Sequence, residues 1–397
     1  MQLIAFDAAA ALVFALARPL ASERIGLEQA DGRILARPVV AQWSSPAVAV
    51  SAMDGYAVRE ADLAGGDIRL PVLGAAYAGH GLDQALAHGA CARVFTGAPL
   101  PVGADRVVIQ EAVRDEGEVA FFADAPCGGR HVRAAGCDFR AGDELLGAWL
   151  RLTPQRLIAA AAADLSELEV VTRPRVMILS TGDELHEPGQ GSCDGTSIPE
   201  SVSFGLAALV RAWGGEVIGR RRLGDQLPLL QAAAGAALEV ADLVVVTGGA
   251  SVGQRDYAKA MFAPFGLDCV FAKVAIKPGK PVWLARAGGK LVVGLPGNPT
   301  AALVTARLLL APLIAGLGGR DPQVAMAWRG ARLAGELKAC GDRETFVRAQ
   351  SVSVGVSPFA DQDSSSQKTL ALADVLIRRR PGDGAAAVGD AVEVLDL

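Results

Sequence analysis

Cysteine and histidine are scarce in this chain of 397 residues, which limits the metal sites and crosslinks that it can form. The six cysteines are scattered without a C-x-x-C pair, so neither a zinc site nor a disulfide framework is expected. The four histidines stand far apart and form no H-E-x-x-H pattern, which argues against a histidine-bound metal. The cysteines are predicted to be reduced thiols with mostly structural roles.

The chain also lacks an excess of positive charge and an uninterrupted apolar run. Its formal net charge of -5 argues against a general nucleic-acid binder. Residues 301–316 are apolar, but Arg307 and Pro312 interrupt them and the run is short for a bilayer. Residues 8–17 lack the preceding basic region of a signal peptide, so a buried helix is predicted there. We therefore expect a cytoplasmic protein that binds neither nucleic acid nor membrane.

The pattern of apolar segments predicts a multidomain α/β plus β protein. The length exceeds what one hydrophobic core usually organises, which favours two to four domains. Between residues 174 and 319, fully apolar strands alternate with helical patterns. This alternation indicates a mostly parallel sheet covered on both faces. Residues 46–134 and the chain after residue 322 carry short strand-like runs and are predicted to be β-rich.

Three glycine-containing loops each follow an apolar strand of the α/β region. Their sequences are STGDE from Ser180, TGGAS from Thr247 and LPGNP from Leu295. Open α/β folds bind ligands at the carboxyl ends of their strands, and glycine lets backbone N–H groups face an anion closely. Ordinary strand–helix turns favour the same residue types. Three such loops at one sheet edge nevertheless favour an anion site.

The segment Lys277-Pro278-Gly279-Lys280-Pro281 is stiffened by its two prolines. This stiffness holds Lys277 and Lys280 in fixed positions, and Lys273 lies on the preceding strand. Ammonium groups held in this way suit phosphate or another tetrahedral oxyanion. The alternative is a solvated lysine turn, which would not need such stiffness.

Four carboxylates, those of Asp183, Glu184, Asp225 and Asp256, are predicted to converge on the same sheet edge. Acidic groups beside an anion site suggest magnesium, which prefers oxygen ligands and bridges carboxylates to phosphates. Helix capping by Asp256 and turn formation by Asp225 are the alternatives. Outside this region the segment SAMDGYAV from Ser51 stands out, although its pattern alone names no substrate.

Six segments resemble the motifs of one family and occur in that family's order across nearly the whole chain. They are SAMDGYAV from Ser51, TGAP from Thr96, STGDEL from Ser180, TGGASVGQRDY from Thr247, AIKPGKP from Ala275 and LPGNP from Leu295. Together they resemble the molybdopterin molybdenumtransferase family, the group of MoeA and the gephyrin E domain. A single glycine loop would be weak evidence, whereas six ordered motifs are very specific.

The resemblance implies a homodimer of elongated, four-domain subunits. The implied domains are an N-terminal domain of residues 1–45 and 135–172, a β-rich inserted module of residues 46–134, a molybdopterin-binding-type α/β domain of residues 173–319 and a C-terminal β-barrel-like domain of residues 320–397. The implied reaction inserts molybdate into adenylated molybdopterin and releases AMP with the help of Mg²⁺. Implied partners are molybdopterin adenylyltransferase and downstream cofactor-maturation proteins.

The resemblance also implies roles for individual residues. Asp54 and Thr96 would help to complete the site from the partner subunit, with support from Asp138. Glu184, Asp225 and Asp256 would serve magnesium and the pyrophosphate. The remaining implied residues would surround the phosphate, the pterin and the oxyanion, and they are Gly248, Gly249, Ser251, Lys273, Lys277, Lys280, Pro296, Asn298, Pro299, Arg348 and Ser364.

Three positions depart from the family pattern. Gln254 stands where an acid is usual, Ala301 replaces a serine for which Thr300 is a candidate substitute, and Val202 lies where an asparagine is expected. These departures leave open a second hypothesis, a catalytically weakened paralogue that acts as a molybdopterin-binding or scaffold protein. The retained carboxylates and lysines favour the enzyme. A nucleotide-sugar or phosphate-transfer enzyme that uses the same anion loops is a third hypothesis, but it would not explain SAMDGYAV.

Overall fold

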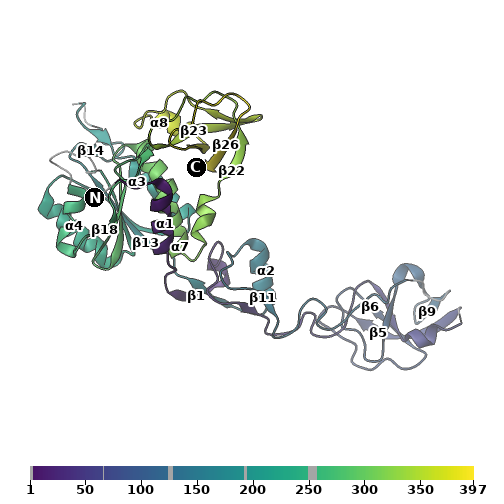
Figure 1. Cartoon of the computed structure of the whole chain (residues 1–397). Coiled ribbons are helices and arrows are strands. Elements are labelled where there is room, and N and C mark those ends of the chain that lie inside the picture. The colour runs from purple at the N-terminus through teal and green to yellow at the C-terminus, as the bar shows by residue number, and fades with distance from the viewer. Residues whose placement is uncertain (1–2, 66, 124–127, 192–194, 249–256) are drawn as a thin grey trace. The chain divides into compact units, whose positions relative to one another are not determined.

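The chain divides into two compact units in this computed structural model, which describes residues 3–65, 67–123, 128–191, 195–248 and 257–397 (Figure 1). The larger unit comprises Met1–Glu23, Gly32–Ala36 and Glu169–Leu397. The smaller unit comprises Arg24–Asp31 and Arg37–Leu168. The predicted division into four domains is finer than these two units and remains a prediction.

A six-stranded sheet forms the centre of the larger unit. Its strand order is β16-β13-β17-β21-β20-β18. The first four strands run parallel, while β20 is antiparallel to both of its neighbours, so the predicted mostly parallel sheet is confirmed. The strand bounds are β13 (Arg175–Thr181), β16 (Glu216–Leu223), β17 (Leu243–Thr247), β18 (Asp268–Phe271), β20 (Trp283–Ala287) and β21 (Lys290–Leu295).

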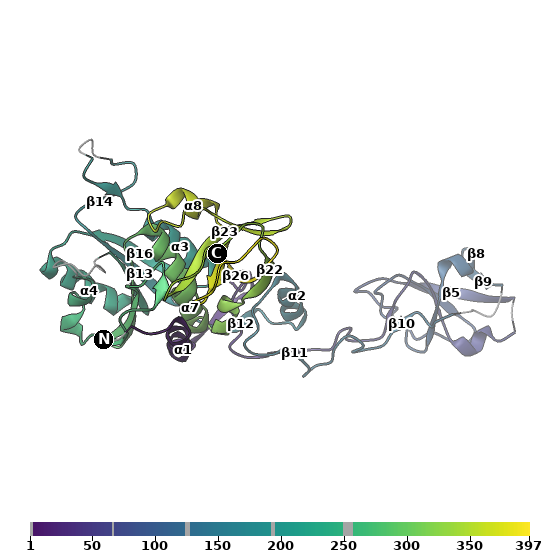
Figure 2. The ribbon, with the colours of Figure 1, turned by 45° about the horizontal axis from the view of Figure 1, so that its top comes forward.

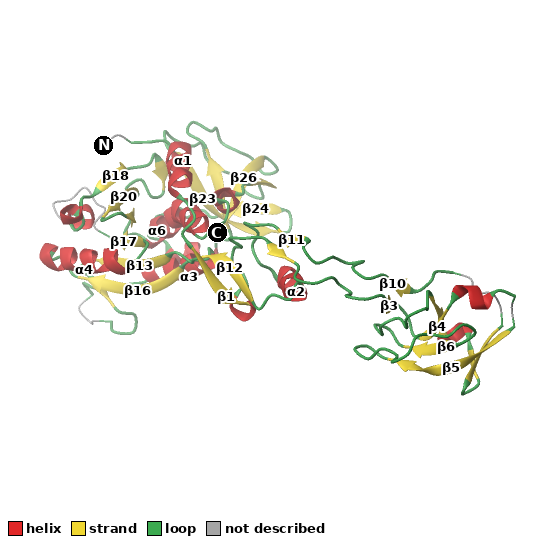
Figure 3. Cartoon of the chain, turned by 90° about the horizontal axis from the view of Figure 1, so that it is seen from below, coloured by secondary structure: helices red, strands yellow, loops and turns green. Residues whose placement is uncertain are grey.

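Helices cover both faces of this sheet, as the continuous apolar strands predict (Figure 3). Neighbouring residues of β13 point to opposite faces, with Ile178 in one buried cluster and Leu179 in the other. The first cluster contains side chains of α1 (Phe6–Leu16), α3 (Val202–Ala212), α6 (Pro299–Thr305), the π turn Ala306–Leu310 and α7 (Ala311–Leu317). The second contains side chains of α4 (Leu227–Val240) and α5 (Tyr257–Ala260), with the 3-10 turn Ala263–Phe265 following.

Among the residues that the structure describes, one helix is long and apolar enough to cross a membrane by length and composition alone. It runs from Pro299 to Leu317, and 94% of its most apolar window is buried inside the larger unit. Arg307, within it, is 6% exposed and donates from Nε to the carbonyl of Asp396 at 2.7 Å and from Nη1 to that of Ala325 at 2.6 Å. Burial lowers the pKa of the Arg307 guanidinium to about 10. This is the central packing helix of a folded domain.

A second sheet follows in the C-terminal part of the larger unit, with strand order β19-β23-β25-β26-β22 and β24 paired to β23. Lys277 of β19 lies opposite Thr345 of β23, so the proline-stiffened lysine segment is joined directly to this sheet. The bounds are β19 (Ile276–Lys277), β22 (Arg329–Arg332), β23 (Glu344–Val352), β24 (Gly355–Pro358), β25 (Val375–Arg379), β26 (Ala391–Asp396), α8 (Gln367–Leu372) and the 3-10 turn Pro322–Met326.

The short strands β14 (Leu185–His186) and β15 (Ile198–Pro199) pair in parallel, and in Figure 2 their segment extends away from the central sheet. The helix α3 follows β15 in the chain.

The smaller unit contains a six-stranded sheet in the order β7-β4-β6-β5-β9-β8, so the predicted β-rich texture is confirmed. Two further strand pairs, β10 with β3 and β11 with β2, belong to the same unit. The bounds are the 3-10 turn Leu27–Gln29, β2 (Val39–Val40), β3 (Val50–Ser51), β4 (Gly55–Val58), the 3-10 turn Glu60–Leu63, β5 (Ile68–Ala76), β6 (Cys91–Val94), β7 (Arg106–Ile109), the 3-10 turn Gln110–Ala112, β8 (Arg114–Asp115), β9 (Val119–Phe122), β10 (Val132–Arg133), β11 (Glu144–Leu146) and α2 (Pro154–Ala162). The strands β1 (Ser22–Gly26) and β12 (Glu167–Val171) lie where the chain passes from one unit to the other.

Candidate functional site

The three glycine loops meet at one edge of the central sheet. They follow β13, β17 and β21, which are parallel neighbours, so their carboxyl ends share an edge. Gly182, Gly248 and Gly297, one from each loop, line a single cavity of about 780 Å³, here called the loop cavity. The structure therefore brings the loops together as predicted. The continuation of the second loop, including Gly249 and Ser251, lies outside the described residues.

Gly248 shows why a glycine is required at this edge. Its φ of +88° is a left-handed conformation that side chains disfavour. A Cβ atom there would lie 2.3 Å from the carbonyl oxygen of Thr181, so no side chain fits without moving the neighbouring loop. The Thr181 hydroxyl in turn donates to the carbonyl of Thr247 at 3.3 Å. Two loops thus approach each other backbone to backbone at the wall of the loop cavity.

Two of the predicted carboxylates, Glu184 and Asp225, line the loop cavity. Asp183 has a different role, because its Oδ1 accepts a hydrogen bond from the backbone N–H of Asp225 at 2.9 Å and ties two loops together. Asp256 and Gln254 lie outside the described residues. Within the described part of the chain no three His, Cys, Asp or Glu side chains cluster closely enough to hold a metal unaided. Magnesium needs only one or two carboxylates when phosphates and water complete its shell, so Glu184 and Asp225 fit it.

Glu200 is a buried carboxylate in the same cavity wall that the sequence alone did not identify. Its Oε1 accepts hydrogen bonds from the hydroxyl of Ser180 at 3.2 Å and from the backbone N–H of Ser203 at 2.8 Å. The hydroxyl of Thr247 donates to that of Ser180 at 3.2 Å, so the network connects two sheet strands to the start of α3. An acidic residue just before a helix was the available signal, since carboxylates cap helix N-termini.

A second cavity of about 530 Å³, here called the lysine cavity, adjoins the first. Lys277, Lys280 and Ser364 line it, as the resemblance implies, and its other wall includes Asn298 and Pro296. Asn298 donates from Nδ2 to the hydroxyl of Ser364 at 3.0 Å, which connects the LPGNP loop to the C-terminal sheet domain. The loop cavity and the lysine cavity share Pro281, Pro296 and Asn298, and Pro299 lines the former.

Arg343, rather than Arg348, lines the lysine cavity. Arg348 is 1% exposed, and its guanidinium donates to three backbone carbonyls of residues 361–366, those of Asp361 at 3.4 Å, Asp363 at 2.9 Å and Ser366 at 3.2 Å. Burial lowers the pKa of Arg348. It therefore supports from behind the loop that carries Ser364, instead of facing the cavity as the resemblance implied.

Lys273 lines neither cavity. It is half-buried, and its carbonyl accepts a hydrogen bond from the backbone N–H of Ile4 at 3.2 Å. The structure thus brings Lys277 and Lys280 together at one cavity and leaves Lys273 outside its lining.

Asp54, Thr96 and Asp138 belong to the smaller unit. Asp54 Oδ1 accepts hydrogen bonds from both the backbone N–H of Thr96 at 2.7 Å and its hydroxyl at 2.8 Å. These bonds lower the pKa of the Asp54 carboxyl, so it is a carboxylate at neutral pH. Asp138 is exposed, and its backbone N–H donates to the carbonyl of Ser45 at 3.1 Å. The two motifs around Asp54 and Thr96 therefore form one local structure.

Comparison with known proteins assigns the chain to a family. Residues 4–163 match the MoeA N-terminal region (domain I and II), residues 177–316 a probable molybdopterin binding domain, and residues 330–397 the MoeA C-terminal region (domain IV). A molybdopterin molybdenumtransferase of Nostoc sp. is 36% identical over 339 residues, which cover 82% of this chain and 76% of the relative. The chain belongs to the MoeA family.

Other members of the MoeA family support the assignment over the whole fold. A molybdopterin molybdenumtransferase of Haemophilus influenzae is 37% identical over 303 residues, which cover 76% of this chain and 74% of the relative. A crystal structure of a molybdopterin biosynthesis MoeA protein from Pyrococcus horikoshii superposes with a TM-score of 0.87 at 26% identity, covering 100% of this chain and 99% of that one. The predicted multidomain α/β architecture is therefore confirmed.

Two of the departures from the MoeA pattern lie at the site. Ala301 is 5% exposed and lines the lysine cavity, so the cavity lacks a hydroxyl at that position. Thr300 does not replace it, because its side chain is fully buried and its hydroxyl donates to the carbonyl of Ser366 at 3.2 Å. Val202, the other departure within the described residues, lines the loop cavity at the start of α3.

Proposed function

We propose that this chain is a molybdopterin molybdenumtransferase, which inserts molybdate into adenylated molybdopterin with Mg²⁺-dependent release of AMP. The observation that carries the proposal is the junction of two cavities of different charge. The loop cavity, with its carboxylates Glu184 and Asp225, meets the cationic lysine cavity at Pro296 and Asn298. The names of the relatives support a transferase and do not favour a scaffold.

The charge of the lysine cavity suits molybdate, a tetrahedral dianion. Lys277 and Lys280 supply compact ammonium charges, and Arg343 supplies a planar fork of N–H donors. The hydroxyl of Ser364 adds a neutral donor at the same wall. Cations and donors gathered around a dianion compensate for the water that it loses on binding.

The loop cavity suits the phosphoanhydride and the pterin. Cleavage of a phosphoanhydride mainly requires positioning and neutralisation of charge. The loops at Gly248 and Gly297 line the cavity without side chains, which lets their backbone approach a phosphate closely, whereas the Gly182 N–H already donates to the carbonyl of Leu223 at 3.1 Å. Magnesium would be held by Glu184 and Asp225, with Asp256 as a further expected ligand, and when bound it would neutralise charge on the phosphates. Gly249 and Ser251 are proposed to extend the same cradle.

We further propose that the protein is a cytoplasmic homodimer in which Asp54, Thr96 and Asp138 of the partner complete the site. Apolar side chains exposed on the smaller unit support a protein–protein contact there, with Trp43 51% and Ile158 71% exposed. These two belong to one region, because the Trp43 indole N–H donates to the carbonyl of Ala162 at the end of α2, which carries Ile158. Molybdopterin adenylyltransferase and cofactor-maturation proteins are the proposed pathway partners.

The proposal predicts that the purified full-length protein releases AMP from adenylated molybdopterin. Release should require Mg²⁺ and should be accelerated by molybdate, because the dianion is the co-substrate. Chromatographic quantification of AMP over time measures both dependences, with the Haemophilus influenzae relative assayed in parallel as a positive control. Absence of AMP release in this chain, while the control is active, would contradict the proposed function.

Replacing Arg343 by methionine and replacing Arg348 by methionine are predicted to have different effects. Arg343→Met should raise the molybdate concentration for half-maximal AMP release at least about tenfold, since a charge-assisted hydrogen bond contributes about 1.5–3 kcal/mol. Arg348→Met should instead lower the free energy of unfolding by about 3 kcal/mol, because buried carbonyls lose their donors. Molybdate titration and urea unfolding of both variants measure these effects. If Arg348→Met raised the required molybdate concentration and Arg343→Met lowered the free energy of unfolding, Arg348 rather than Arg343 would contact the anion.

A further inference from the structure

Two stacked aromatic rings, those of Tyr77 and Phe95, lie in the smaller unit next to the TGAP loop. Their centroids are 4.8 Å apart and the rings are nearly parallel, with an angle of 10° between their planes. Phe95 immediately precedes Thr96, which the proposed function places in the site. The proposed reaction gives neither ring a role.

The topology of the sheet in the smaller unit brings the two rings to one edge. The strands β5 and β6 are parallel neighbours, and their pairing extends to the last residue of each strand (Figure 3). Tyr77 follows β5 and Phe95 follows β6, so both side chains belong to the edge at which the TGAP loop begins. A Cβ atom on Gly97 would lie 3.6 Å from the Cβ atom of Ala78. The turn that carries Tyr77 therefore packs against the TGAP loop.

The backbone holds Tyr77 in a defined position. Its N–H donates to the carbonyl of His80 at 2.8 Å, and the N–H of His80 donates to the carbonyl of Tyr77 at 2.9 Å. Gly79 closes this turn with a φ of +82°, which glycine adopts without strain. A ring on a fixed turn loses little conformational freedom when a ligand binds to it.

Arg93 connects the aromatic pair to Asp54. Its guanidinium carbon lies 5.2 Å from the centroid of the Phe95 ring. The pKa of Asp54 is lowered chiefly by its hydrogen bonds with Thr96, and the positive charge of Arg93 lowers it further. Arg93 is therefore within electrostatic reach of the Asp54 carboxylate. Phe95 contacts both Arg93 and Tyr77, so these side chains and Asp54 form one continuous region.

One face of the Tyr77 ring is available to a ligand. Phe95 covers the other face, and yet the residue is 52% exposed. Any apolar side chain would shield Phe95 from water, so packing alone does not require a flat ring at this position. A planar heterocycle stacks on such a face, and this contact does not depend on a particular pattern of hydrogen bonds.

We propose that Tyr77 stacks against a planar heterocycle of the adenylated pterin substrate, with Phe95 behind it and Asp54 and Thr96 beside it. This inference rests on the proposed function, in which these residues of one protomer complete the site of its partner. The substrate contains two flat heterocycles, adenine and pterin, and both offer the π surface that stacking requires. Tyr77 would thus contribute affinity for the organic substrate and none for molybdate. No covalent step is involved.

Binding of adenylated molybdopterin tests the inference without turnover. Calorimetric titration of the full-length protein, with Mg²⁺ and molybdate left out, measures the Kd. Tyr77→Ala should raise the Kd about tenfold, which is typical for the loss of one stacked base. Tyr77→Phe keeps the ring and should bind as the wild type does. Tyr77→Leu keeps an apolar cover on Phe95 without a flat face and should bind as weakly as Tyr77→Ala. Wild-type affinity in Tyr77→Leu would overturn the stacking.

Phe121→Leu is the matched control within the same sheet. Phe121 on β9 also contacts a guanidinium group, since the Arg114 carbon lies 4.4 Å from its ring centroid. It pairs with Arg69 near the start of β5, whereas Tyr77 follows the end of that strand. Phe121→Leu should therefore bind with wild-type affinity. An equal loss in Phe121→Leu and Tyr77→Ala would indicate a general effect on the sheet and would overturn the inference.

AMP and molybdopterin, titrated separately, identify the stacked ring. If adenine stacks on the tyrosine, Tyr77→Ala should weaken AMP binding and leave molybdopterin binding unchanged. If the pterin stacks there, the effects should be exchanged. Unchanged affinity for both ligands would contradict stacking by either heterocycle.

Kinetics separate a binding role from a structural one. Tyr77→Ala should raise the KM for adenylated molybdopterin about tenfold, while the saturated rate of AMP release and its molybdate dependence stay within about twofold of wild type. A structural role would lower the saturated rate instead, and that result would overturn the inference. A wild-type protein that binds the substrate but releases no AMP would contradict only the proposed function, because the Kd comparison still tests Tyr77. A wild-type protein that does not bind the substrate would refute both.

Discussion

Replacing Lys277 by alanine is expected to lower the rate of molybdate-stimulated AMP release by at least about a hundredfold. A preorganised cation beside a negative charge stabilises the transition state by several kcal/mol, and this stabilisation would be lost. Lys277 lines the lysine cavity, where its ammonium group would face the bound anion. It is also exposed, so its removal leaves no hole in a core. The measurement is the rate of AMP formation across a molybdate titration.

Lys368→Ala is the matched control for Lys277→Ala, since it removes the same side chain from an exposed position of α8. Both variants should unfold in urea at the wild-type midpoint, which separates a catalytic loss from a folding defect. Full activity of Lys277→Ala would exclude this lysine from the mechanism and would leave Lys280 and Arg343 as the only cations of the lysine cavity.

Gly294→Ala is expected to destabilise the central sheet by about 3 kcal/mol or more, at the upper end of the cost of overpacking a core. Gly294 on β21 lies opposite Trp283 on β20, and a Cβ atom there would lie 1.9 Å from Trp283 Cε2. The Trp283 ring is 1% exposed and packs edge-on against Phe262, so it has no room to withdraw. Urea unfolding followed by tryptophan fluorescence measures the change.

Gly330→Ala provides the comparison, because it makes the same substitution in a strand where a Cβ atom would meet nothing within 4 Å. Its urea midpoint should equal or slightly exceed that of the wild type, since alanine restricts the unfolded chain more than glycine does. Equal midpoints for the two variants would show that Trp283 can move, and the argument from its packing would then be wrong. The loop that follows β21 carries Pro296 and Asn298, so Gly294→Ala should also reduce AMP release.

Arg343 illustrates where inference from the sequence ends. Arg348 lies within β23, whereas Arg343 immediately precedes this strand. Arg343 lines the lysine cavity, and Arg348 lies behind the loop of residues 361–366. The motif resemblance could not assign a face, because the register of β23 depends on its pairing with β19 and β25.

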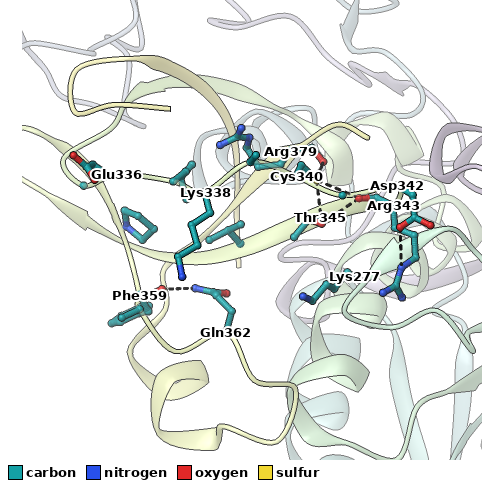
Figure 4. A pocket seen from close by; sticks show the side chains of 17 residues that line it. Lys277, Glu336, Lys338, Cys340, Asp342, Arg343, Thr345, Phe359, Gln362 and Arg379 are labelled. Atoms are coloured by element: carbon teal, nitrogen blue, oxygen red, sulfur yellow. Dashed lines mark hydrogen bonds and ion pairs between the residues drawn. The ribbon is translucent and has the colours of Figure 1, made fainter. Parts of the chain in front are cut away.

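Glu200 was missed for a related reason. The buried network of Glu200, Ser180, Ser203 and Thr247 joins residues up to 67 positions apart in the sequence. A lone acid before a helix has an ordinary capping explanation, and only burial together with several donors reveals its wider contribution. The same argument applies to Lys338 and Arg379, which no motif singles out and which the fold brings to one cavity in the C-terminal part of the larger unit (Figure 4).

The sequence by itself determined the parallel sheet, the three loops at its carboxyl edge and the stiff lysine segment, because apolar periodicity and turn residues act over a few neighbouring positions. The tertiary structure alone decided which cations share a cavity, since strand register and the docking of the C-terminal sheet on residues 276–277 depend on distant contacts. It also decided that Arg348 supports a loop while Arg343 faces the anion site. Strands, turns and single charged segments can therefore be predicted from the sequence, whereas the grouping of charged side chains into sites arises only when remote segments pack together.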